Sequence, residues 1–447
     1  MVKMTYKFLH LANYKDIPNW SVQYANDEDL GFTKKYQMAR IGSFLTRRKE
    51  AIDIQDGIIY KRVTVSTKGG NITIRDEKDG KLIGTKKQFV IHEGQFLLSK
   101  IDARNGAYGV VPAIAEGAII TGNFWTYDVD YERINPQFLT LVTKTQQFLD
   151  FAEKSSNGTT NRHYLQEEAF LNQQIPLPSI EEQKLILDDY NRHIESAIRK
   201  QYKIESLAFD SQKLICNILG IKQKVSPKSE SLLQFIHLTD TGSRWDALAD
   251  TYAIESKYQI YNLGKFIIHI STGTTPPTSH PEYFDGDVKF FTPADLGNNK
   301  YLEHSSRTIT DIAIDDKKAR VYHKGDILFV GIGSTVGKVG IVKDEMVSSN
   351  QQITGFTIDS SKINPEYVYY YLLYNRDITT ADQSKTTLPI VNQDKICKIP
   401  IVVPPIKVQD EIVSSLDKMY LEAKRDEKEI TVLERKAISL FEHKIFD

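Results

Sequence analysis

Two short motifs have residue types that could bind a nucleotide or a nucleobase. The first, GIGSTVGKVG from Gly331, combines glycines with a lysine, as a phosphate-binding loop does. That loop needs four residues between its first glycine and a Gly-Lys pair, with Ser or Thr next. Here Gly331 lies one residue too far away and Val339 follows Lys338, which argues against a nucleotide-phosphate loop.

The second motif, Asn-Pro followed by an aromatic residue, occurs as NPQF at Asn135 and NPEY at Asn364. It superficially resembles the Asn-Pro-Pro-aromatic motif with which amino-methyltransferases hold a flipped base. Both copies lack the second proline, and no separate glycine-rich cofactor motif precedes them. We therefore predict a turn followed by a helix at each position. The histidines show no metal-ligand spacing, and no nucleophile-base pair can be assembled, so we predict no catalytic residues and no metal site.

Polar loops remain as candidates. RNGAYG at Arg104 parallels GSTVGK at Gly333, and SSNGTTNRHYL at Ser155 parallels DQSKTTLPIVN at Asp382. Arg, Lys, Asn and Thr side chains can reach phosphates and base edges, although solvated surface loops have the same composition. The candidate DNA-binding residues are Arg104, Asn105, Asn161 and Arg162 in the first set, and Ser334, Thr335, Lys338, Lys385 and Thr386 in the second.

These loops are parallel because half of the chain is repeated. KYQMARIGSFL at Lys35 returns as KYQIYNLGKFI at Lys257, an offset of 222 residues. GQFLLSKIDARNGAYGVV at Gly94 returns as GDILFVGIGSTVGKVGIV at Gly325, an offset of 231. IPLPSIEEQKLIL and IVVPPIKVQDEIV, near the end of each copy, are offset by 226. Small changes of offset indicate loop insertions in two diverged copies.

Each copy has two unlike parts. Short β-rich runs separated by Gly, Asn, Thr and Pro predict a compact α/β or mainly β domain. After Pro178 and Pro404 a long heptad pattern predicts a helix that forms a coiled coil. Gln201 and Glu427 interrupt the seam at equivalent positions, either as tolerated imperfections or as a layer that sets the register. The predicted seam residues include Ile180, Leu187, Ile194, Ile204, Ile406, Val413, Tyr420 and Ile430.

The predicted fold class is α+β. We expect a tandem pseudo-twofold repeat of two globular domains, each followed by a long helix, with the two helices packed as an antiparallel coiled-coil spacer. The predicted boundaries are 1–176 for the N-terminal segment and first domain, 177–222 for the first helical region, 223–244 for a linker, 245–402 for the second domain and 403–447 for the second helical region.

Composition excludes little beyond a membrane protein. The chain has 447 residues, 40% hydrophobic and 26% charged, with a net charge of −1. No apolar run approaches the roughly 20 residues of a membrane span, and lysines interrupt the apolar residues of the N-terminus, so a cytoplasmic location is expected. A net charge near zero does not exclude nucleic-acid binding, which requires only a local basic surface.

The junction between domain and helix carries a family resemblance. PLPSIEEQ, Pro176 to Gln183, is similar to the PLPPLEEQ-like motif of specificity subunits of type I restriction-modification systems. The second copy, VPPIKVQ, keeps Pro404, Pro405, Ile406 and Gln409 but has Val408 where the family favours Glu. The family's Gly-x-Ile-Leu strand and Gly-Lys turn match Gly325 to Lys338 and, more loosely, Gly94 to Gly109.

The resemblance covers nearly the whole chain. It implies a non-catalytic subunit that reads double-stranded DNA with two target recognition domains, each recognising half of an asymmetric bipartite target. The diverged stretches TRRKEAIDIQDGIIYKRV and ISTGTTPPTSHPEYFDGDVKFF would read different half-sites. Two methyltransferase subunits and a motor-nuclease restriction subunit would be partners and would carry S-adenosylmethionine, ATP and magnesium. The alternatives are a specificity chain of a type IIB or IIG-like system and a coiled-coil scaffold that binds no nucleic acid.

Overall fold

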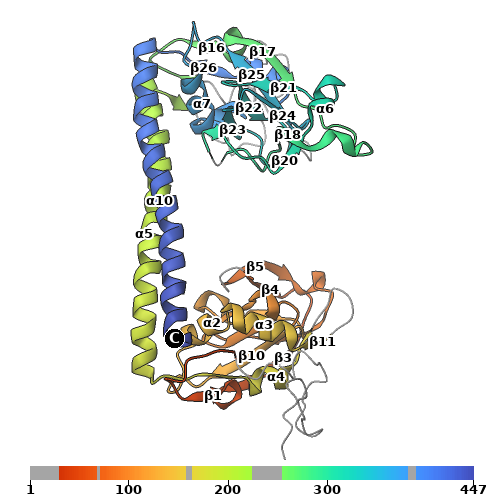
Figure 1. Ribbon diagram of the computed structural model, residues 1–447, viewed down its shortest axis with the longest axis vertical. Coiled ribbons are helices and arrows are strands. Elements are labelled where there is room, and N and C mark those ends of the chain that lie inside the picture. The colour runs from red at the N-terminus through yellow and green to blue at the C-terminus, as the bar shows by residue number, and fades with distance from the viewer. Residues whose placement is uncertain (1–29, 68–70, 158–163, 224–253, 298, 381–388) are drawn as a thin grey trace, which may run out of the picture. The chain divides into compact units, whose positions relative to one another are not determined.

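The computed structural model describes residues 30–67, 71–157, 164–223, 254–297, 299–380 and 389–447. Its contacts divide the chain into two compact units, which are Met1–Arg199 with Glu429–Asp447 (unit 1) and Lys200–Lys428 (unit 2). Each unit contains β-sheets, short helices and parts of two long helices, α5 (Ile180–Leu219) and α10 (Ile406–Phe446) (Figure 1). The predicted α+β fold class is confirmed.

Unit 1 is built on two main sheets. One has the strand order β2-β10-β7-β8, and the other has the order β3-β6-β9-β4-β5. The strands are β1 (Met38–Arg40), β2 (Leu45–Arg48), β3 (Ala51–Asp53), β4 (Ile59–Val65), β5 (Ile72–Asp79), β6 (Lys87–Val90), β7 (Phe96–Ser99), β8 (Tyr108–Val110), β9 (Ile119–Ile120), β10 (Phe124–Val129), β11 (Ser156–Asn157), β12 (Tyr164–Leu165) and β13 (Gln174–Pro176). The short helices are α2 (Pro136–Val142), α3 (Gln146–Lys154) and α4 (Glu167–Asn172).

Unit 2 also has two main sheets, with the orders β17-β25-β22-β23-β19 and β20-β18-β24-β21. Its strands are β14 (Lys222–Gln223), β15 (Ile254–Glu255), β16 (Ile260–Asn262), β17 (Ile267–Thr272), β18 (Phe284–Phe291), β19 (Tyr301–Leu302), β20 (Arg307–Ile309), β21 (Val321–His323), β22 (Ile327–Val330), β23 (Val339–Val342), β24 (Met346–Ser349), β25 (Ile353–Ile358) and β26 (Pro400–Val402). Its short helices are α6 (Asp311–Asp315), α7 (Pro365–Tyr374), α8 (Arg376–Thr379) and α9 (Gln393–Lys398).

Strand register shows that the repeat is structural. Leu97 of β7 pairs with Gly109 of β8, and the equivalent Leu328 of β22 pairs with Gly340 of β23. The first strand of each domain pairs with its last, β1 with β13 and β16 with β26, in the same register. A shift of one residue would turn every side chain to the opposite face of a sheet, so matching registers mean matching cores. The predicted tandem repeat is confirmed.

The second sheet differs between the units. In unit 1 the hairpin of β4 and β5 extends a sheet that also contains β3, β6 and β9. In unit 2 the corresponding region holds β18 and β20, with α6 between β20 and β21. The two stretches that diverge most in sequence therefore build different structures on a shared framework.

A buried glutamine docks each domain onto its own long helix. In unit 1 the Oε1 of Gln183 accepts from the Asn135 N–H (2.7 Å), and its Nε2 donates to the carbonyls of Arg133 (3.0 Å) and Pro178 (2.9 Å). In unit 2 Gln409 does the same for Asn364, with 2.9 Å to its N–H, and donates to the Pro404 carbonyl at 2.8 Å.

The two asparagines explain the Asn-Pro motifs. The side chain of Asn135 accepts from the Gln137 N–H and caps α2, while Asn364 caps α7 through the N–H groups of Glu366 and Tyr367. The proline follows at the first helical position, where its missing N–H costs nothing. The predicted turn and helix are confirmed at both sites, and the motif joins each domain to the glutamine of its long helix.

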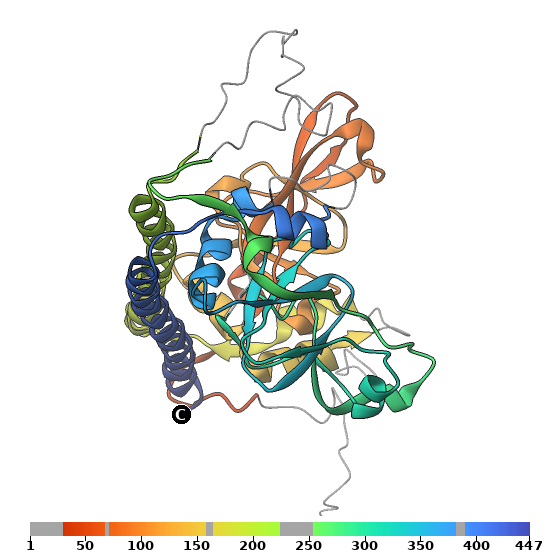
Figure 2. The same cartoon turned by 90° about the horizontal axis from the view of Figure 1, so that it is seen from above.

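The two long helices lie side by side in both views (Figure 1, Figure 2). Within unit 2, Ser211 contacts Met419 at 3.6 Å, Lys203 contacts Glu422 at 2.5 Å and Lys200 contacts Asp426 at 2.8 Å. Residue numbers rise along one helix as they fall along the other, so the helices are antiparallel, as predicted.

Seven of the eight seam residues that the heptad pattern predicted are at least partly buried. Leu187 and Val413 are buried, and Ile180, Ile194, Ile204, Tyr420 and Ile430 are half-buried. Ile406 is 50% exposed, so its assignment to the seam is wrong, because it is the first residue of α10 and precedes the first turn that packs. Tyr420 bonds to the globular part of unit 2, where its hydroxyl accepts from the Lys300 N–H at 3.1 Å.

The predicted polar layer, by contrast, is displaced by one residue. Gln201 and Glu427 are exposed, whereas Asp426 is fully buried beside Lys200 and Lys203. A heptad count assumes that only the partner helix covers the seam. In each unit the globular core covers the helices as well, since Leu187 and Phe441 belong to the core of unit 1 and Val413 and Leu416 to that of unit 2.

Because the long helices are packed into the cores of both units, they are not separate from the globular parts. The sequence prediction separated the helical regions 177–222 and 403–447 from the globular domains. In the structure each long helix contributes one end to each unit, because its apolar side chains are buried with that unit's sheet and short helices. No helix within the described part of the chain is long and apolar enough to cross a membrane.

Candidate nucleic-acid interface

Three segments meet at the same edge of the first sheet in each unit. In unit 1 the Lys100 N–H donates to the Asn123 carbonyl at 2.9 Å, and the Lys100 carbonyl accepts from the Leu165 N–H at 3.0 Å. In unit 2 Gly331 takes the place of Lys100, donating to Gln352 and accepting from Val391, both at 2.8 Å. We call residues 100–107, 121–123 and 164–165 loop cluster 1, and residues 331–338, 350–352 and 389–391 loop cluster 2.

The first segment of each cluster makes an equivalent tight turn. Gly106 and Gly337 occupy matching positions and have φ of 82° and 89°, a left-handed conformation that other residues rarely adopt. The Arg376 guanidinium buttresses the second turn, its Nε donating to the Val336 carbonyl at 2.8 Å. The two turns that the sequence predicted to be equivalent therefore have the same backbone course.

The predicted DNA-binding residues fall in or next to these clusters. In cluster 1 Arg104 is half-buried and Asn105 is exposed. In cluster 2 Ser334 is exposed, and Thr335 and Lys338 are half-buried. Asn161, Arg162, Lys385 and Thr386 lie outside the described residues, but the chain that follows each of these loops, Tyr164–Leu165 and Pro389–Val391, bonds to its turn. The structure thus brings the predicted turns together with the segments that follow the other two predicted loops.

A basic cluster lies beside loop cluster 1, formed by Arg47, Lys49 and Lys100. The Arg47 guanidinium lies over the rings of Trp125 (5.4 Å) and Tyr127 (5.3 Å), and the Lys100 ammonium lies 5.9 Å from the Trp125 ring. Such contacts hold a cation over an aromatic face without neutralising it. The basic cluster is therefore positioned by strands β2, β7 and β10 of the rigid sheet.

Positive charge in the basic cluster is incompletely balanced. Glu167 is the carboxylate that contacts Arg47, at 3.2 Å, while the buried Nε of Arg47 makes no hydrogen bond within the described protein. Burial, followed by the charge of Arg47, lowers the pKa of Lys100. A nearby anion would favour the charged form of Lys100 and oppose this lowering of its pKa, so the cluster has the electrostatics of a phosphate-binding surface.

Unit 2 has hydroxyls and amides at the equivalent place. Thr272, Thr354 and Gln393 form a hydroxyl-amide cluster, in which the two threonine hydroxyls lie 2.9 Å apart and the Gln393 Nε2 donates to Thr272 at 2.8 Å. Thr354 stands where unit 1 has Trp125, and Gln393 where it has Glu167. Asn350, Gln351 and Gln352 lie in the adjoining turn.

Sequence reasoning missed Arg47, Lys100, Thr272 and Gln393. The signal for Arg47 was present, because TRRKE opens the diverged stretch of the first copy and places three basic residues in a row. Lys100 and Gln393 carried no comparable signal, since only the pairing of distant strands and helices brings them to the cluster.

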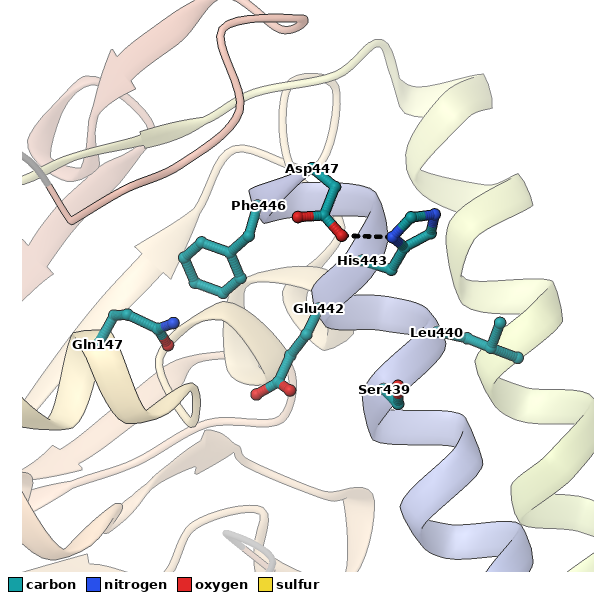
Figure 3. A pocket seen from close by; sticks show the side chains of 7 residues that line it. All are labelled: Gln147, Ser439, Leu440, Glu442, His443, Phe446 and Asp447. Atoms are coloured by element: carbon teal, nitrogen blue, oxygen red, sulfur yellow. Dashed lines mark hydrogen bonds and ion pairs between the residues drawn. The ribbon is translucent and has the colours of Figure 1, made fainter.

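Other hollows and clusters are poorer candidates. A pocket of about 390 Å³ lies where α10 ends in unit 1, next to Gln147 of α3 (Figure 3). Its lining includes the carboxylates of Glu442, whose pKa is raised by burial, and Asp447, which is paired with His443. Negative charge would repel DNA there. Among the residues that the structure describes, no group of three or more His, Cys, Asp or Glu side chains is placed to hold a metal ion.

Comparison with known proteins identifies the family. The sequence matches the type I restriction modification DNA specificity domain over residues 3–206 and 255–435. The chain belongs to this family. Membership makes it a DNA-specificity chain of a restriction-modification system, which directs the complex to its target and is not its catalytic subunit. The resemblance found in the sequence is confirmed.

Individual relatives agree with this assignment. The type I restriction enzyme MjaIX specificity subunit of Methanocaldococcus jannaschii is 28% identical over 191 residues, a match that covers 41% of this chain and 43% of the relative. The MjaVIII specificity subunit of the same organism is 22% identical over 411 residues, 88% of each chain. A solved chain from work on assembly and conformational transition of a type I R-M system has a TM-score of 0.51 at 17% identity, covering 92% of this chain and 98% of that one, which shows the same fold.

Proposed function

We propose that the family member described here reads an asymmetric bipartite DNA target, with loop cluster 1 and the basic cluster on one half-site and loop cluster 2 and the hydroxyl-amide cluster on the other. One observation carries this proposal: the same backbone bonds assemble three loops at the same sheet edge in both units, yet the side chains on them differ. Two domains that recognise different DNA sequences would need the same loop backbone with different polar side chains.

The chemistry of the two clusters suggests different modes of contact. Arg and Lys supply phosphate contacts and bidentate contacts to guanine, whereas Gln and Asn pair with adenine and Thr can contact either type of base. Unit 1 would therefore take more of its binding energy from charge, and unit 2 more from neutral hydrogen bonds. The nine predicted loop residues, from Arg104 to Thr386, would act in the same two sets.

The partners would supply the chemistry. Two methyltransferase subunits would bring S-adenosylmethionine, and a motor-nuclease restriction subunit would bring ATP and magnesium, all in the cytoplasm, where the DNA lies. In support of this, the sequence contains neither a nucleotide-phosphate loop nor a base-gripping Asn-Pro-Pro motif. The pure chain should neither methylate nor cleave DNA.

The decisive experiment is methylome sequencing of cells with and without the gene, in the presence of the partner subunits. A bipartite motif with two different halves should be methylated only when the gene is present. A binding assay with fragments that contain this motif should then show specific retention by the assembled complex. A palindromic motif, or methylation that does not depend on the gene, would contradict the proposal.

A further inference from the structure

The charged contacts between α5 and α10 lie at a special level of the helix pair. α5 begins at Ile180 and α10 at Ile406, so equivalent residues of the two helices are 226 apart. Lys200 and Asp426, which are hydrogen-bonded at 2.8 Å, are also 226 apart. They are therefore equivalent residues of the two repeats that face each other, which happens only at the central level of an antiparallel pair of similar helices.

Four side chains form a charged layer at this level. Asp426 has a side chain that is 1% exposed, and it contacts Lys200 at 2.8 Å and Lys203 at 3.3 Å. Glu422 contacts Lys203 at 2.5 Å. The Lys200 hydrogen bond holds the pKa of Asp426 below its usual value, and the carboxylates of Glu422 and Asp426 raise the pKa of Lys203. All the cations come from α5 and all the anions from α10.

The apolar positions cannot tell the two helices apart in this way. Several equivalent positions carry similar apolar side chains on both helices, so either helix would present apolar side chains to another copy of itself as well. Such pairs are Leu187 and Val413, Ala197 and Ala423, and Ile204 and Ile430.

Self-pairing would change the layer completely. Two copies of α5 would place Lys200 against Lys200, and Lys203 against Ser196, which is the equivalent of Glu422. Two copies of α10 would place Asp426 against Asp426, and Glu422 against Glu429, the equivalent of Lys203. A buried charge without its counter-ion is strongly destabilising, and a like charge beside it adds repulsion.

We propose that the charged layer selects the partner of each helix, so that the first half of a chain pairs with a second half and rejects another copy of itself. Specificity of this kind comes from penalties on the wrong pairs as well as from the contacts of the right one. The penalty is greater for α10, because Asp426 is almost fully buried, whereas the longer Lys200 side chain is 27% exposed and can extend toward water.

Pairing of unlike helices also affects target recognition. If the proposed function holds, obligatory pairing of unlike halves keeps two different readers in every complex, and the target stays asymmetric. The pairing of the helices does not depend on DNA, so it can be tested without any target and separately from the proposed function.

The test uses full-length chains in which the charged-layer residues of one helix are replaced by those at the equivalent positions of the other helix. The acidic-layer chain carries Ser196→Glu, Lys200→Asp and Lys203→Glu, and the basic-layer chain carries Glu422→Ser, Asp426→Lys and Glu429→Lys. A chain with all six substitutions has the charged layer restored with its polarity reversed and serves as the matched control. Thermal unfolding of each chain, and the mass of differently tagged chains after mixing, are measured by calorimetry and by light scattering after size exclusion.

We expect the acidic-layer and basic-layer chains to unfold roughly 5 to 10 °C below wild type, with the lower unfolding temperature for the acidic-layer chain. The six-substitution chain should unfold near the wild-type temperature. Mixed together, the acidic-layer and basic-layer chains should exchange helices and form a 1:1 complex, whereas two tagged wild-type chains should not. Should the acidic-layer or basic-layer chain be insoluble alone, co-expression replaces mixing, and recovery of both chains as one soluble complex supports the proposal. The proposal is overturned if the acidic-layer and basic-layer chains are as stable as wild type. It is also overturned if neither mixing nor co-expression gives a 1:1 complex while the six-substitution chain is soluble.

Discussion

Loop clusters 1 and 2 have equivalent main-chain bonds, but different side chains surround them in the two units. Lys100 and Gly331 make equivalent main-chain bonds, but the surroundings are Arg47 and Trp125 in unit 1, and Thr272 and Thr354 in unit 2. Main-chain bonds tolerate any side chain that leaves the turn intact. A reader of DNA can therefore change what it recognises without changing how its loops are held.

Replacing one domain with a second copy of the other should change the recognised target most. A chain in which residues 38–176 are exchanged for a second copy of residues 260–402 keeps both end strands, which pair in the same register in each unit. Both halves of its methylated motif should then match the half that unit 2 reads. Methylome sequencing gives the answer directly, and survival of the original unit 1 half-site would show that the domains do not read independently.

A smaller effect is expected from the basic cluster. Arg47→Ala and Lys100→Ala should each weaken binding, and should each reduce the slope of log affinity against log salt by about 1 if the contact is to a phosphate. If the contact is to a base, the cost is about 1 to 3 kcal/mol and the unit 1 half-site alone is relaxed. Titrations over a range of salt concentrations separate the two results. Arg192→Ala, an exposed arginine on α5, is the matched control and should change neither quantity.

The hydroxyl-amide cluster should behave differently. Gln393→Leu removes a neutral amide of similar size, so it should cost about 1 to 3 kcal/mol at one position of the unit 2 half-site and leave the salt slope unchanged. Gln201→Leu, on the exposed face of α5, is the control. Binding to a panel of single-base variants of the target measures both outcomes. A changed salt slope for Gln393→Leu would remove the proposed difference between the units.

The smallest expected effect is on stability against pH. His92 of unit 1 lies 2.8 Å from Glu116 and 3.1 Å from Glu50, and these two carboxylates raise its pKa. Its contribution to the free energy of unfolding is then complete below the unfolded pKa, about 6.5, and is lost as pH rises through the folded value. Exposure of all three side chains keeps this contribution small.

Unit 2 supplies the control for this prediction. The equivalent His323 contacts the backbone carbonyl of Glu345 at 3.1 Å in place of two carboxylates. Denaturant unfolding between pH 5.5 and 8.5 should lose part of its pH dependence in His92→Gln and keep it in His323→Gln. Equal behaviour of the two variants would contradict the assignment.

Sequence alone predicted the features that repeat. Two copies of a strand-turn-strand pattern must pair in one way if the same apolar residues are to be buried, so the fold and the equivalent turns around Arg104 and Ser334 followed from the duplication. The basic cluster did not follow, because Arg47 and Lys100 meet only through the pairing of β2, β10 and β7. The burial of Asp426 likewise depends on packing that a heptad count does not contain.

The buried glutamines Gln183 and Gln409 have a consequence for how such genes change. Each accepts from the N–H of the equivalent asparagine and donates to the equivalent proline carbonyl, next to the junction where β13 or β26 ends. A crossover between two genes at that junction would join a foreign domain to a resident helix with the clamp intact. New DNA targets could then arise in a single recombination event, with no period of mutation during which the protein fails to fold.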